Sequence, residues 1–132
     1  MLISRQLAKN ALLTILALVT LFHILALLTI IPHTVVWAGK FNSYKEVLPF
    51  EIFSLVINLS FILLVSYRVR NDASKAGRIG MWMMFILFAL NTVGNFFAET
   101  DIEKYAGIPL TFLLAVLSLR LALKDNPEQN PA

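Results

Sequence analysis

LPFEIFSLVINLSFILLVSY, residues 48–67, is the stretch that decides the fold. A helix of about twenty residues is long enough to cross the hydrocarbon core of a bilayer. Pro49 stands near its start, where a helix tolerates proline. Tyr67 and the arginines that follow it are typical of a membrane surface. The sequence therefore predicts a membrane-spanning helix at residues 48–67.

Three polar residues interrupt this apolar stretch at helical spacing. Glu51, Ser54 and Asn58 recur three and four positions apart, so they share one face of the predicted helix. Polar side chains are costly in lipid unless they are paired. The face that carries them therefore requires neighbouring helices that cover it.

The composition of the whole chain agrees with a membrane location. Of its 132 residues 58% are hydrophobic and 14% are charged, and the mean hydropathy is +0.76, whereas a soluble domain carries about 25% charged residues. The length indicates one integral membrane domain, residues 1–132. The absence of cysteine excludes disulfides and thiolate metal sites.

Further apolar runs lie on both sides of the central stretch. We expect an all-α fold, a four-helix antiparallel transmembrane bundle, with helices at about 11–31, 48–67, 79–98 and 105–123 and a polar tail at 124–132. Pro32 should end the first helix, because proline disfavours a helical residue before it. The loop at 32–47 contains Trp37, which we expect to lie at the depth of the lipid headgroups.

The distribution of positive charge predicts the orientation in the membrane. Eight Lys and Arg residues lie in the N-terminal head, in the loop at 68–78 and near the C-terminus, and three lie in the other two loops. Loops rich in Lys and Arg stay in the cytoplasm. We therefore expect a multi-pass protein of the plasma (inner) membrane with both termini cytoplasmic. Because the basic residues mark helix ends, they indicate topology and not a nucleic-acid surface.

Polar residues within the apolar runs are the candidate binding site. Counting about 1.5 Å per residue from the helix ends places His23, Asn58 and Asn91 in one layer of the bundle, in its outer half. Other polar groups come nearer the outer rim. The sequence therefore predicts one polar cleft open to the outside, whose candidate ligand-binding residues are His23, His33, Trp37, Glu51, Ser54, Asn58, Asn91, Asn95 and Glu99.

Each of these residues also has a purely structural interpretation. The asparagines can hydrogen-bond across helices, at about 1 kcal/mol for each pair. Glu51 can interact with the positive end of a helix dipole, and His23 can bond a neighbouring carbonyl or threonine. The sequence leaves both interpretations open.

The sequence offers no signature of a catalytic or cofactor site. The two histidines, His23 and His33, are ten residues apart with Pro32 between them, which argues against ligation of a haem within one chain. No metal-binding spacing, glycine-rich phosphate loop or Ser-His-Asp set is present. We therefore expect no metal and no cofactor. An acid–base pair of His33 and Glu51 at the outer rim is the one enzymatic arrangement that remains.

Two segments resemble small bacterial integral membrane proteins with four helices and no established activity. They are IPHTVVWAGKF, which leads into FEIFSLVINL, and LNTVGNFFAETDIEKYAGIPLTFLLAVLSLRLAL. The matching positions are Pro32, Trp37, Phe50, Glu51, Ser54, Asn58, Asn91, Thr92, Gly94, Asn95, Glu103, Lys104 and Pro109. In these proteins a glycine often stands where this chain has Lys40. The resemblance implies the fold and the membrane location, and implies no catalytic activity.

Three functions are compatible with this sequence. The first is a non-enzymatic membrane protein whose outward cleft binds a small molecule, a lipid or a partner helix. The second is a small transporter or channel that uses His23 and Glu51, built as a homo-oligomer or with a partner membrane protein. The third is an enzyme that acts on a lipophilic substrate through His33 and Glu51. We expect the lipid bilayer as a partner, and no nucleic acid.

Overall fold

The computed structural model describes residues 2–125, and within this range it is helical, without strands. The long helices are α1 Arg5–Leu27, α2 Tyr44–Arg70, α3 Lys75–Phe96 and α4 Ile108–Ala122. Two short elements, η1 Trp37–Gly39 and the π-helical turn η2 Glu103–Gly107, precede α2 and α4. The prediction of an all-α chain with four long helices is confirmed. The predicted tail at 124–132 lies almost wholly outside the described residues.

Serine caps decide where two of the helices begin. The Ser4 hydroxyl accepts a hydrogen bond from the amide of Leu7, so α1 starts at Arg5 and not at residue 11. The Ser74 hydroxyl accepts from the amide of Gly77, so α3 starts at Lys75 and not at residue 79. Both helices also end earlier than predicted, at Leu27 and Phe96. The basic residues at their starts are therefore helical.

The helix α2 begins before its proline. It starts at Tyr44, so Pro49 lies inside the helix and not in its first turn. Glu46 in the first turn accepts a hydrogen bond from the amide of Asn42 over 3.0 Å, which satisfies a backbone donor ahead of the helix. The helix also continues past Tyr67 to Arg70. The predicted bounds of 48–67 were therefore too short at both ends.

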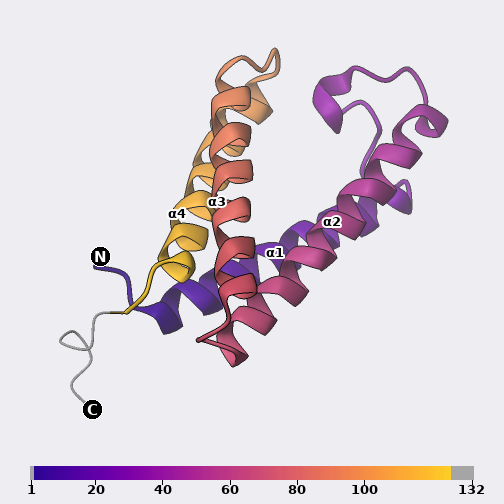
Figure 1. Cartoon of the computed structure of the whole chain (residues 1–132). Coiled ribbons are helices and arrows are strands. Elements are labelled where there is room, and N and C mark those ends of the chain that lie inside the picture. The colour runs from indigo at the N-terminus through magenta and orange to yellow at the C-terminus, as the bar shows by residue number, and fades with distance from the viewer. Residues whose placement is uncertain (1, 126–132) are drawn as a thin grey trace.

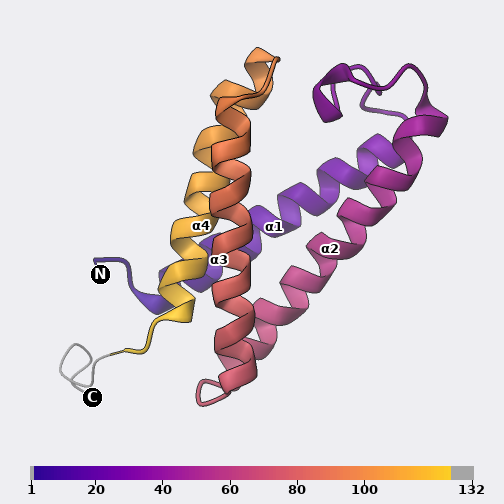
Figure 2. The same ribbon diagram turned by 45° about the horizontal axis from the view of Figure 1, so that its top comes forward.

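The helices form two pairs that meet at one end and part at the other (Figures 1 and 2). One pair is α1 with α2, and the other is α3 with α4. We call the end where the pairs meet the terminal end, because the start of α1, the α2–α3 connection and the end of α4 come together there. The opposite end, which holds residues 28–43 and 97–102, is the loop end.

Two separate apolar clusters match this shape. The larger cluster joins all four helices towards the terminal end and includes Leu12, Val65, Met81 and Leu121. A smaller cluster of Ala26, Val36 and Val47 holds the first loop onto its own helix pair at the loop end. No buried cluster among the described residues joins the two pairs at the loop end. The two helix pairs therefore share an apolar core only towards the terminal end.

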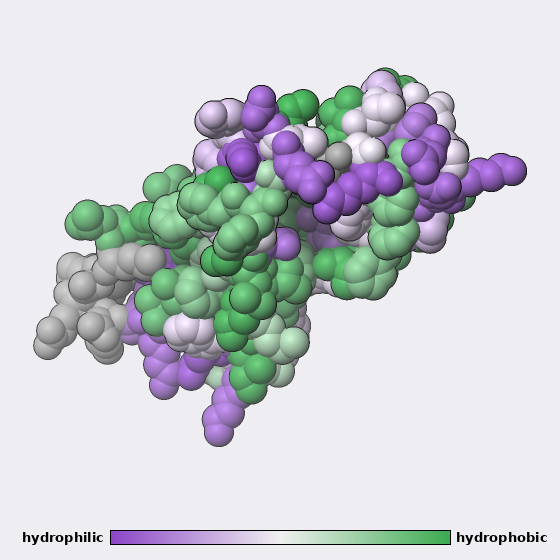
Figure 3. Space-filling view, turned by 90° about the horizontal axis from the view of Figure 1, so that it is seen from above, coloured by the Kyte–Doolittle hydropathy of each residue, from purple (hydrophilic) through white to green (hydrophobic). Residues whose placement is uncertain are grey.

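All four helices are long and apolar enough to cross a membrane. Large apolar side chains face outward along them, including Leu63 at 71% exposure and Leu90 at 67%. Figure 3, seen from above, shows hydrophilic side chains over the upper and right-hand part of the molecule and at its lower margin, and green, apolar surface over most of the rest. Outward apolar side chains along the helices are expected of a multi-pass membrane protein.

Candidate functional site

Glu51 is a buried carboxylate with two side-chain partners. Only 1% of the residue is exposed. Its Oε2 lies 2.6 Å from Nδ1 of His23 on α1, and its Oε1 accepts a hydrogen bond from Nε1 of Trp37 over 2.9 Å. Because both carboxylate oxygens are occupied, the side chain is held in one position, and α1, α2 and the first loop are joined at this point.

The first loop folds back over α2 to bring Trp37 to Glu51. Trp37 has φ = 52°, in the left-handed region that a residue other than glycine rarely adopts. Gly39 follows with φ = 64°, and a Cβ there would lie 3.0 Å from the carbonyl oxygen of Thr34. The rings of Trp37 and Phe41 both pack on Phe50, with centroids 5.5 and 4.8 Å away. These contacts hold the loop in its conformation.

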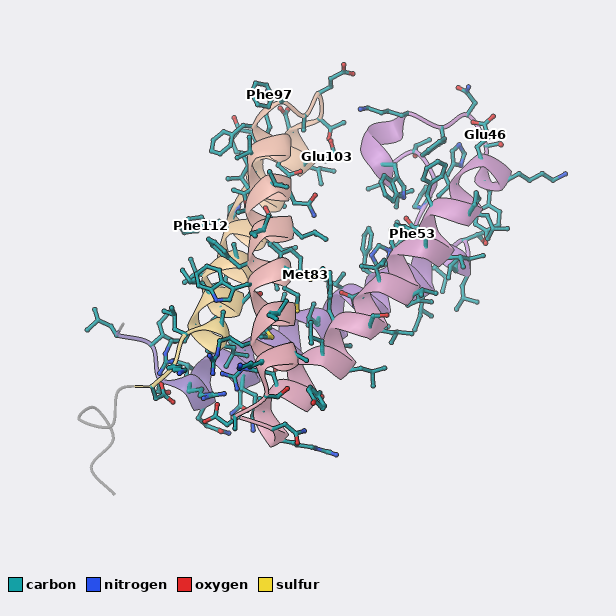
Figure 4. All side chains as sticks on the ribbon, in the orientation of Figure 1. Glu46, Phe53, Met83, Phe97, Glu103 and Phe112 are labelled. Atoms are coloured by element: carbon teal, nitrogen blue, oxygen red, sulfur yellow. The ribbon has the colours of Figure 1, made fainter. Side chains whose placement is uncertain are left out.

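A cavity of about 260 Å³ lies beside this triad, between the two helix pairs at the loop end. One wall comes from α1, α2 and the first loop, and the other from η2 and the start of α4. Figure 4 shows Glu103 near the top of the α3–α4 pair, on the side facing the first loop. The lining residues are Phe22, His23, Val35, Val36, Trp37, Glu51, Ile102, Glu103, Ala106, Gly107 and Leu110.

The lining has a defined hydrogen-bonding character. If Glu51 is ionised, Nδ1 of His23 must donate to it, and Nε2 of a neutral ring is then an acceptor. Glu103 adds a second carboxylate to the cavity. Most of the remaining wall is aliphatic or aromatic. The arrangement can therefore hold an apolar body and accept hydrogen bonds from a polar head.

Asn58 lies deeper and serves to join helices. Its Nδ2 donates to the carbonyl oxygen of Leu16 over 2.8 Å and to Oγ1 of Thr20 over 2.6 Å, both on α1. It is 6% exposed and does not line the cavity. Thus Glu51 and Asn58 both bind α1, as expected for two residues on one face of α2. These bonds are the ones that the structural interpretation of Asn58 expects.

The predicted layer of His23, Asn58 and Asn91 is not formed. The side chain of Asn91 is exposed and makes no hydrogen bond with residues 2–125. The layer fails because the helix pairs part at the loop end, which leaves α3 away from α1. The depth count assumed four parallel axes, and it started from helix ends that differ in the structure: α1 ends at Leu27 and α2 begins at Tyr44, so Asn58 lies deeper than His23.

The remaining predicted residues are dispersed. Asn95 donates to Oγ1 of Thr111 over 3.3 Å and so joins α3 to α4. Ser54 and His33 are half-buried, Glu99 is exposed, and none of the three lines the cavity. The proposed acid–base pair of His33 and Glu51 is not present, because His23 and Trp37 occupy the Glu51 carboxylate.

A second polar cluster, at the terminal end, was not predicted as a site. Arg68 is fully buried; its Nε donates to the carbonyl oxygen of Leu121 and its Nη1 to Oδ1 of Asp72 over 2.7 Å. Asp72 also pairs with Arg5 over 2.5 Å. Arg120 pairs with Asp125 over 2.5 Å. Sequence reasoning treated these arginines as topology signals only; Arg68, in the last turn of an apolar helix, was the available clue.

The acids of this cluster are held in their ionised form. Burial raises the pKa of Asp72, but hydrogen bonds and charge from Arg68 and Arg5 outweigh it, so the pKa lies below its usual value. A hydrogen bond from Arg120 is the main cause of the lowered pKa of Asp125. The cluster is therefore a network of ion pairs at neutral pH.

Within residues 2–125, no three His, Cys, Asp or Glu side chains are grouped so that they could hold a metal ion. No family model, curated protein or solved structure matches this chain. The resemblance to small bacterial four-helix membrane proteins therefore remains a prediction.

Proposed function

We propose that this chain is a non-enzymatic membrane protein whose cavity at the loop end binds an amphipathic small molecule or lipid. The observation that carries the proposal is the buried Glu51, fixed by His23 and Trp37 beside a cavity between two helix pairs. Burying a carboxylate is costly, and its two bonds hold it rigidly at the wall. Rigid polar groups in an apolar pocket are what a binding site needs.

The lining favours a ligand whose head donates hydrogen bonds. His23 Nε2 and the carboxylate of Glu103 offer acceptors, so an amine or hydroxyl head fits them. The aliphatic and aromatic wall, with Leu110 and Ile102 on one side and Phe22 on the other, suits an apolar tail. A polypeptide helix is about 10 Å wide and would have to part the pairs further. A partner helix is therefore the less favoured occupant.

The proposal includes an orientation in the membrane. The excess of Lys and Arg at the terminal end supports a cytoplasmic location for that end. Both termini are then cytoplasmic, the four helices run antiparallel through the inner membrane, and the cavity opens towards the outer face. A ligand would enter from the outer leaflet or from the water above it.

Photolabelling of the full chain in vesicles tests this function. The probe is a phosphatidylethanolamine with a diazirine in its acyl chain, and the labelled residues are identified by mass spectrometry. We expect labelling of the cavity wall that unlabelled phosphatidylethanolamine displaces. Leu110→Trp fills the cavity and should abolish most of this labelling. Leu113→Trp, outside the cavity on the same helix, should leave the labelling unchanged. Labelling that no competitor displaces, or that Leu110→Trp leaves intact, would contradict the proposal.

The short contact between His23 and Glu51 favours a second candidate, proton-coupled transport in an oligomer. A histidine–carboxylate pair inside a membrane is a common element of proton pathways. This candidate predicts proton uptake by proteoliposomes that carry a pH-sensitive dye, and its loss in Glu51→Gln. If the wild-type vesicles take up no protons above the protein-free rate, binding without transport is the function that remains.

A further inference from the structure

A second cavity, larger than the one described above, lies at the terminal end, away from the site proposed above. Its volume is about 730 Å³, and it lies between the start of α1, the end of α2 and the segment after α4. Its lining residues are Leu2, Ile3, Ser4, Arg5, Gln6, Lys9, Val69, Asp72, Arg120 and Asp125. Basic groups and apolar side chains therefore share one cavity.

The cations of this cavity exceed its acids. Arg5, Lys9 and Arg120 line it together with two aspartates. Both aspartates are already paired with arginines, Asp72 with Arg5 and Arg68 and Asp125 chiefly with Arg120. Lys9 makes no side-chain hydrogen bond or ion pair within residues 2–125. The cavity therefore keeps a positive charge after its own ion pairs are made.

One guanidinium nitrogen in the wall lacks an acceptor. The Nη2 atom of Arg5 is buried and has no hydrogen-bond partner among the residues that the structure describes. Its Nη1 atom already lies 2.5 Å from Asp72. A buried charged donor without a partner is unfavourable. This atom requires an acceptor from outside the described chain.

We propose that the cavity binds a phosphate group, carried by an anionic phospholipid or by a soluble phosphate. Guanidinium groups are well suited to phosphate oxygens, and Lys9 adds a point charge. Basic pockets between helices at the cytoplasmic surface are where anionic headgroups bind. Leu2, Ile3 and Val69 would contact the glycerol and the first carbons of the chains. The lipid is therefore the favoured source of the phosphate.

The test uses the purified full chain in dodecyl maltoside. Native mass spectrometry measures the affinity for added phosphatidylglycerol and for phosphatidylcholine, and unfolding temperature is measured with inorganic phosphate alone. We expect phosphatidylglycerol to bind more tightly than phosphatidylcholine. Lys9→Gln should weaken its binding about fivefold, the effect of one cation at a membrane surface. Arg5→Gln should weaken it further.

Arg70→Gln is the matched control, since it removes the same charge from an exposed site at the same end, outside the cavity. It should leave phosphatidylglycerol binding unchanged. A saturable rise in unfolding temperature with inorganic phosphate, lost in Lys9→Gln, would assign the site to a soluble phosphate. Equal binding of the two lipids without such a rise, or an equal loss in Lys9→Gln and Arg70→Gln, would overturn the proposal. Because the Lys9 side chain makes no hydrogen bond or ion pair within the described chain, Lys9→Gln should fold even if Arg5→Gln does not.

Discussion

Glu51 is the residue on which the loop end depends. Its carboxylate is buried, and it connects α1 to the first loop through His23 and Trp37. Removing a hydrogen-bond donor from a buried carboxylate leaves its charge less compensated, which costs about 1–3 kcal/mol. The pair therefore stabilises the fold as well as forming the wall of the cavity.

The first prediction concerns this pair. His23→Ala should lower the free energy of unfolding by about 2 kcal/mol, measured by titration with dodecyl sulfate in mixed micelles. Leu21→Ala, on the exposed face of α1, should change it by less than about 0.5 kcal/mol, because lipid-facing truncations lose little packing. In the double variant His23→Ala with Glu51→Ala, the losses should not add. Additive losses would show that the two residues act independently.

The second prediction concerns the aspartate in the α2–α3 connection. The pKa of Asp72 is lowered in the folded state, so its ion pairs contribute stability at neutral pH. That contribution should be lost as the pH falls below about 4, through the lowered pKa of the folded state. In Asp72→Asn this part of the pH dependence should be absent while the neutral-pH stability is lower. Identical unfolding profiles of the two proteins between pH 3 and 7 would rule the ion pairs out as a source of stability.

At the scale of elements, the contact of α2 with α3 depends on a small residue. A Cβ on Gly80 would lie 2.5 Å from Cδ1 of Leu64. This space is what allows the two helix pairs to approach each other near the terminal end. Farther out, the ring of Phe61 meets that of Phe88 with centroids 5.4 Å apart.

The third prediction follows from this contact. Gly80→Ala should be less stable than Gly94→Ala by about 1 kcal/mol, the low end of the cost of overpacking, because the methyl groups of Leu64 can move aside and both changes gain the same helix propensity. A Cβ on Gly94 meets nothing within 4 Å, so it is the matched control. In a Leu64→Ala background the difference should vanish, as measured by dodecyl sulfate unfolding. A difference that persists there would place the strain elsewhere.

The sequence was sufficient to predict the number of helices and their apolar character, because a long apolar run without charged residues indicates a membrane-spanning helix. It was less informative about their ends. Apolar runs mark what lies in lipid, whereas α1 and α3 begin at serine caps several residues earlier. Ser4 and Ser74 were readable signals. Pro49 was misleading, because it marks the second turn of α2 and not its start.

The site could be predicted only in part. His23, Trp37 and Glu51 stood out as polar or amphipathic groups of the outer half, although the sequence placed them at different depths, and they line one cavity. Their bonds could not be read from spacing, since the loop that carries Trp37 turns back through unusual φ angles. Asn91 was misplaced because no local signal reports how far two helix pairs diverge.

At the scale of the whole molecule, the two polar ends differ in charge and in packing. The terminal end is closed by ion pairs and carries most of the Lys and Arg residues. The loop end is open between the pairs and carries more acids. A membrane protein with this asymmetry should insert with the terminal end in the cytoplasm.

The fourth prediction tests that orientation. The natural chain has no cysteine, so single cysteines report without background. Lys40→Cys in the first loop should react with a membrane-impermeant maleimide on intact cells. Ala73→Cys in the α2–α3 connection should react only after lysis. The reverse pattern would mean that the positive charges do not determine the topology.

The divergence of the helix pairs is the central claim, because it creates the cavity and separates Asn91 from His23. Leu64 and Gly80 mark the faces of α2 and α3 that meet. Eleven residues, about three turns, farther along each helix, Phe53 and Asn91 lie on the same two faces. In a closed bundle these residues would touch, but in this structure Asn91 is exposed.

Disulfide formation in two double-cysteine variants measures this divergence. Cysteines at Leu64 and Gly80 should oxidise rapidly with copper phenanthroline in native membranes, since a disulfide needs Cα atoms within about 7 Å. Cysteines at Phe53 and Asn91 should remain reduced under the same conditions. Oxidation of the Phe53–Asn91 pair as fast as the Leu64–Gly80 pair would show a closed bundle and contradict this account.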